Sequence, residues 1–167
     1  MLQFIKCHAW PIATFFIIAA AGYFARSAIG TVYSAAEAIV LLDALSRAGL
    51  YLASAIAGGS TTILALMLTL IGMIRRMDHD FSDQAYRDVD LIARLATASL
   101  LGSLFLLLAF VFPVGEFEDL PRRWFETLYE ALFIGTVTVI GLAGATVVLM
   151  YITLRRVIAH ITPGDAV

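Results

Sequence analysis

The chain has 167 residues, of which 61% are hydrophobic and 14% are charged, and its mean hydropathy is +0.91. A soluble domain of this length does not need so apolar a composition, so we expect a polytopic membrane protein. The net charge of −2 gives no electrostatic basis for binding nucleic acid. Cys7 is the single cysteine, which excludes an intrachain disulfide and a site built from several cysteines.

The first uncharged run, residues 9–25, predicts the first transmembrane helix. Trp10 and Tyr23 stand near its ends, where interfacial aromatic residues lie, and Pro11 fits a first helical turn. A cleaved signal peptide is the alternative, because residues 25–27 resemble a small-x-small cleavage site. We favour retention of this helix as an anchor, since further spans follow it.

Residues 27–48 mix Glu37, Asp43 and Arg47 with an apolar background. This composition is too polar for a membrane span and too apolar for a free linker. We therefore expect either an amphipathic helix at the membrane surface or an extension of the flanking spans beyond the lipid.

Residues 50–74 form a second span of twenty-five uncharged residues, about 37 Å long as a helix. One side of this helix collects small, weakly polar residues, and the opposite side, which includes Ile63, Met67 and Leu70, is bulky. Lipid chains give helices no hydrophobic reason to associate, so close backbone approach marks protein contacts. The small side is predicted to pack against protein and comprises Ser54, Gly58, Thr61, Ala65, Thr69 and Gly72.

The polar residues 75–94 separate this span from a third at 95–112, and a fourth follows at 128–154. The same argument from small side chains predicts helix contacts on the later spans at Ser99, Gly102, Ser103, Gly141 and Gly144. We expect an all-α, four-transmembrane-helix bundle made of two helical hairpins, forming a single domain over residues 1–167.

The distribution of lysine and arginine outside the spans predicts the orientation. Seven of these residues lie at the two termini or in segment 75–94, and four lie on the other side. Positive residues favour the cytoplasmic side, so both termini and segment 75–94 are expected there, with the chain in the inner membrane.

No sequence motif indicates catalysis, and we expect no enzyme and no cofactor. The chain has neither an HExxH nor a GxSxG motif, and its three histidines lie outside the spans, where they cannot hold a haem between helices. The acidic cluster Asp78-His79-Asp80 with Asp83 lacks the glycine and the glutamate of an EF-hand. Arginines stand beside it, so we interpret it as a solvated turn and expect no metal site.

Two functional hypotheses remain. The first is a scaffold or accessory subunit that binds other copies of itself or other membrane subunits in the lipid bilayer through its small helix faces. The alternative is a homo-oligomeric cation channel whose acidic outer vestibule holds Glu126, Glu130 and Glu37, with threonine hydroxyls along the path. Headgroup water and nearby Arg122 or Arg123 give Glu130 a simpler interpretation as a neutralised surface carboxylate.

Overall fold

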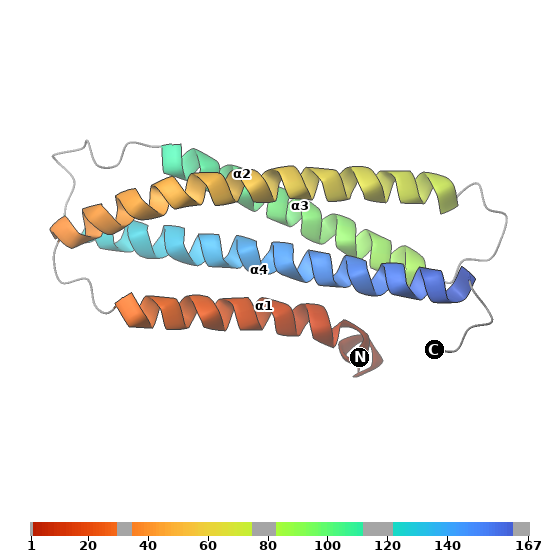
Figure 1. Cartoon of the computed structure of the whole chain (residues 1–167). Helices are drawn as coiled ribbons and strands as arrows, with labels where there is room; N and C mark the ends of the chain where they lie inside the picture. The colour runs from red at the N-terminus through yellow and green to blue at the C-terminus, as the bar shows by residue number, and fades with distance from the viewer. Residues whose placement is uncertain (1, 30–34, 75–82, 112–121, 162–167) are drawn as a thin grey trace.

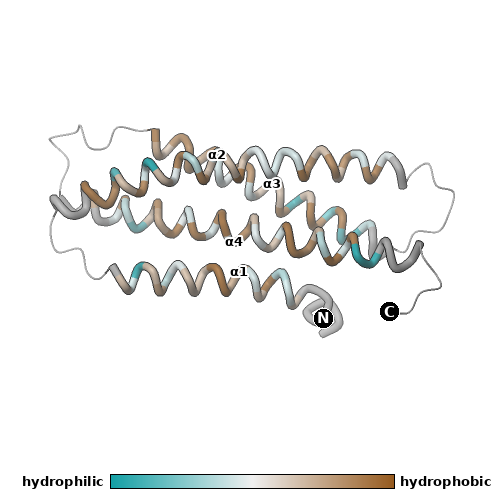
Figure 2. The backbone as a smooth tube through the Cα atoms, viewed as in Figure 1, coloured by the Kyte–Doolittle hydropathy of each residue, from teal (hydrophilic) through white to brown (hydrophobic). Residues whose placement is uncertain are grey.

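A computed structural model describes residues 2–29, 35–74, 83–111 and 122–161 of the chain. These residues form four helices and no strand (Figure 1): α1 Leu2–Ile29, α2 Ala35–Ile74, α3 Asp83–Val111 and α4 Arg122–Ile161. Each helix is long and apolar enough to cross a membrane, and Figure 2 shows the strongly hydrophilic residues gathered towards the helix ends. The all-α class with four candidate spans is therefore confirmed for the described residues.

The helices α2 and α4 are each 40 residues long, or about 60 Å, which exceeds the roughly 40–45 Å of a whole bilayer. Within the described residues no separate surface helix precedes the second span, because the more polar segment from Ala35 onward is the first part of α2. Arg47 stabilises this part through an ion pair with Asp43, one helical turn earlier, at 2.8 Å. The described part of residues 27–48 from Ala35 onward is therefore continuous with the second span, and its position relative to lipid stays a prediction.

The helices α2, α3 and α4 pack against one another, whereas α1 packs mainly on α4, on the side away from α2 (Figure 1). Consecutive helices run in opposite directions. Leu2, Ile74, Asp83 and Ile161 therefore lie at one end of the bundle, called here the N/C end, and the opposite end is called the loop end. The prediction of two hairpins is not supported, because α1 pairs with α4 rather than with its neighbour α2.

The core of the three-helix unit has two apolar clusters. The cluster towards the loop end comprises Leu42, Ala53, Leu106, Phe110, Phe125, Tyr129, Leu132 and Val139. Met67, Val89, Ile92 and Leu149 form the other, towards the N/C end. Between them lie the buried hydroxyl residues Ser60, Ser99, Ser103 and Thr146. Their small side chains let the three helix backbones approach at mid-length.

Candidate functional site: an exposed small face and two interhelical ion pairs

The small side of α2 is exposed along its whole length. All six of its predicted packing residues are solvent-accessible in the single chain: Ser54, Gly58, Thr61, Ala65, Thr69 and Gly72. A Cβ atom built at Gly58 or Gly72 would meet nothing within 4 Å. This face therefore has open space beside it.

The opposite side of α2 makes the contacts with α3 and α4. Met67 is 7% exposed, and Ile63 and Leu70 pack against its cluster. The bulky side, predicted to face lipid, therefore packs inside the chain, and the prediction that the small side packs against protein is not met by any described helix of the same chain. The physical reason is that bulky side chains fill the space between three mutually packed helices, so α2 needs close approach only locally, as at Gly49 beside Phe110.

Small residues on the other helices do stand at helix contacts. A Cβ atom at Gly22 of α1 would lie 2.7 Å from Cγ2 of Val137 on α4, and one at Gly141 of α4 would lie 2.8 Å from the ring of Phe15. Gly144 and Gly102 are equally close to side chains of facing helices, and Ser99 and Ser103 on α3 are 0% exposed. The glycines of α2 at Gly58, Gly59 and Gly72 differ from all of these in meeting nothing.

The threonines on the exposed α2 face donate their hydroxyl protons within the helix. Thr61 donates to the carbonyl oxygen of Ala57 at 2.9 Å, and Thr69 donates to that of Ala65 at 3.0 Å. Thr62 donates in the same way to the carbonyl oxygen of Gly58 at 2.9 Å. The face consequently presents methyl groups and hydroxyl acceptors, with its donors already satisfied.

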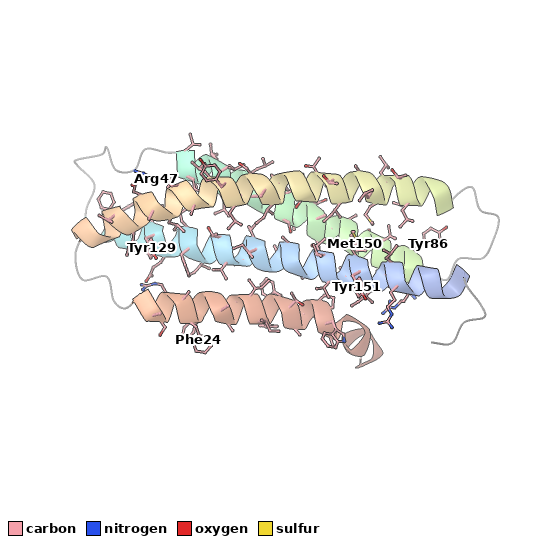
Figure 3. The ribbon with its side chains drawn as sticks, viewed as in Figure 1. Phe24, Arg47, Tyr86, Tyr129, Met150 and Tyr151 are labelled. Atoms are coloured by element: carbon pink, nitrogen blue, oxygen red, sulfur yellow. The ribbon has the colours of Figure 1, made fainter. Side chains whose placement is uncertain are left out.

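Glu130 of α4 pairs with Arg26 of α1 at the loop end of the bundle. The Arg26 Nη2 to Glu130 Oε1 distance is 3.0 Å, and the Glu130 side chain is 57% exposed. The Arg26 guanidinium also lies 5.8 Å from the ring centre of Tyr129, a residue labelled in Figure 3. The partner of Glu130 is thus on another helix. The side chains of Glu126 on α4 and Glu37 on α2, proposed with it as a vestibule, lie outside the described side chains.

A second ion pair joins α3 to α4 at the N/C end, between Asp88 and Arg156. The sequence argument missed it, although it carries the most deeply buried described charge: the Asp88 side chain is 2% exposed. A signal was present in the helical spacing. Asp88 precedes Ile92 by four residues and Ser99 by eleven, which places it on the same, fully buried side of α3.

Within the described residues, no group of three or more histidine, cysteine, aspartate or glutamate residues could hold a metal ion. The cluster around His79 that we interpreted as a solvated turn lies outside the described side chains. Comparisons of the chain with protein-family models, with curated proteins and with solved structures give no match. The exposed face of α2 and the two ion pairs are therefore the features on which a function can be argued.

Proposed function

We propose that this chain is a non-enzymatic membrane protein that assembles with a second copy of itself through the exposed small face of α2. The observation that carries the proposal is the contrast among glycines. Side chains of facing helices occupy the space beside Gly22, Gly102 and Gly141. Gly58 and Gly72, on a helix of membrane-spanning length, have open space beside them. Small residues on a helix face let the backbone of another helix approach closely in lipid.

The spacing of the face supports a symmetric contact. Ser54, Gly58 and Thr62 are four residues apart, as are Thr61, Ala65 and Thr69, and small residues at this spacing allow two helix backbones to cross closely. A two-fold axis along the face brings identical surfaces together.

Charge is compatible with a second copy. Asp43 and Arg47 lie on the same side of α2 as Gly58 and pair with each other within the chain at 2.8 Å. This end of the face therefore presents a neutralised pair, and two identical faces can meet there without an uncompensated charge.

Two features support the membrane location. The ion pairs at Glu130 and Arg156 are 26 residues apart on α4, or about 39 Å, which is enough to place both beyond a hydrocarbon layer of roughly 30 Å. The described large apolar residues on the outer surface, including Phe16, Leu68 and Phe105, suit contact with lipid.

The orientation follows from the charge distribution in the sequence. The excess of lysine and arginine at the N/C end favours a cytoplasmic position for that end.

Disulfide crosslinking in native membranes tests the assembly. In a Cys7→Ser background we expect Ala65→Cys to form a disulfide-linked dimer under mild oxidant, because Ala65 lies on the proposed contact. The control Leu104→Cys is also exposed but lies on α3, and we expect it to remain monomeric. Gly58→Leu added to Ala65→Cys should abolish the crosslink, whereas Ala20→Leu, a similar change at an exposed position of α1, should leave it intact.

If Ala65→Cys gives only monomers, this function is excluded. If Ala65→Cys instead crosslinks to a different protein, the partner is a foreign subunit and not a second copy of this chain. We do not extend the proposal to cation conduction, since Arg26 on α1 neutralises Glu130, the described carboxylate of the expected vestibule. If the wild-type protein conducts cations into liposomes and Glu130→Gln reduces that flux, the channel hypothesis is favoured instead.

A further inference from the structure

An apolar cavity of about 390 Å³ lies between α1 and α3, with α4 as its floor. Phe15 of α1, Leu91 and Leu95 of α3, and Leu149 of α4 are among the lining residues, all of which have hydrocarbon side chains. Ile12 and Phe16 on its α1 side are 46% and 64% exposed, so the cavity opens onto the outer surface of the bundle. Its volume lies in the range of ordinary small-ligand sites, roughly 300–1,000 Å³.

Positive charge stands beyond one end of this cavity. Arg156 follows Leu149 by seven residues on α4, which places it on the same side of the helix and about 10 Å nearer the N/C end. Arg155 beside it is exposed, and the Arg156 side chain is 38% exposed while it pairs with Asp88. The described charged side chains of this end are Arg87, Asp88, Asp90, Arg94, Arg155 and Arg156. Among these described side chains, four arginines stand against two aspartates, which is a net positive charge.

We infer that the cavity binds one acyl chain of an anionic phospholipid, with the lipid phosphate near Arg155 and Arg156. This inference rests on the membrane location proposed above. A hydrocarbon lining that opens sideways suits a hydrocarbon chain, and the arginines suit a phosphate at the depth where headgroups lie. The site is distinct from the proposed dimer contact, because α2 contributes no lining residue.

Native mass spectrometry of the full chain tests this site. The protein is reconstituted with equal amounts of phosphatidylglycerol, which is anionic, and phosphatidylethanolamine, which is zwitterionic, and is then released from mild detergent. We expect one retained phospholipid per chain, with phosphatidylglycerol preferred. Ile12→Trp fills the cavity and should lose the lipid. The control Ile17→Trp, on the same helix but outside the lining and 67% exposed, should keep it.

A separate variant tests the contact between the arginines and the lipid phosphate. Arg155→Gln should lower the ratio of phosphatidylglycerol to phosphatidylethanolamine about fivefold, the effect of one surface charge on an anionic lipid. Arg47→Gln, at the loop end, should leave the ratio unchanged. Equal lipid retention by Ile12→Trp and the wild type, or an unchanged ratio in Arg155→Gln, overturns the inference. The same spectra report copy number, so a wild-type dimer that carries no lipid refutes this site alone, and wild-type monomers that carry a lipid refute the assembly alone.

Discussion

Arg156 on α4 donates a hydrogen bond to the carboxylate of Asp88 on α3, sixty-eight residues earlier in the chain. The two side chains are not equally buried: Asp88 is 2% exposed and Arg156 is 38% exposed. Removing one partner of a buried pair is costly because the remaining charge stays away from water. The cost should therefore depend on which partner is removed.

We expect Arg156→Gln to be more harmful than Asp88→Asn. The first removes the Arg156 cation from a carboxylate that stays buried and should reduce the free energy of unfolding by about 3 kcal/mol. The second leaves a partly hydrated guanidinium and should cost about 1–2 kcal/mol. Thermal unfolding in mild detergent measures both. Asp90→Asn, which breaks an exposed pair with Arg94, is the control and should cost less than about 1 kcal/mol. A loss in Asp88→Asn as large as that in Arg156→Gln would contradict this account.

The glycine contacts predict a second asymmetry. Gly22→Ala places a methyl group 2.7 Å from the branched side chain of Val137, so α1 or α4 must shift, at about 1–3 kcal/mol. Gly58→Ala adds the same methyl group into open space and should leave the unfolding of the isolated monomer unchanged or slightly improved. Thermal unfolding of the monomer in detergent distinguishes the two variants. Equal melting temperatures for both would mean that α1 is not seated on α4 as described.

The Arg26–Glu130 pair should contribute little to stability. Glu130 is 57% exposed, so either Arg26→Gln or Glu130→Gln should cost less than about 1 kcal/mol. Each should therefore unfold closer to the wild type than Gly22→Ala does, in the same detergent. A larger loss in Arg26→Gln than in Glu130→Gln would assign the difference to the contact of Arg26 with the Tyr129 ring.

Cysteine labelling in intact cells tests the orientation of the chain. Asp43 and Asp90 are both exposed, the first towards the loop end and the second towards the N/C end. In a Cys7→Ser background, a membrane-impermeant maleimide should label Asp43→Cys and should reach Asp90→Cys only after the cells are permeabilised. Labelling of Asp90→Cys in intact cells would invert the orientation inferred from the lysine and arginine distribution.

The positions of the helices could be predicted from the sequence because an uncharged run of about twenty residues must satisfy its backbone internally in lipid, and a helix does so. The four candidate spans, at Ala9–Ala28, Val40–Gly72, Tyr86–Val111 and Thr127–Arg156, overlap the predicted runs at 9–25, 50–74, 95–112 and 128–154. Each helix begins before its predicted run, and the difference is largest for α2. Its first turns remain helical outside the apolar run because Ala-rich sequence and the Asp43–Arg47 pair favour helix.

The pairing of the helices could not be predicted from the same information. Small faces occur on α2, α3 and α4, and the rule that small residues mark contacts does not say whether the contact lies inside the chain or outside it. Ser99 and Gly141 stand at contacts within the chain, whereas Gly58 does not. Helical spacing could have placed Asp88 on a buried side, but not opposite Arg156.

The sequence by itself determined that this chain forms apolar helices of membrane-spanning length, because composition and charge-free length act locally along the backbone. The tertiary structure decided which side of each helix meets another, because that depends on how side-chain volumes fill the space between helices distant in sequence. Bulky Met67 therefore lies inside and slender Gly58 outside, and Arg156 lies where it can neutralise Asp88.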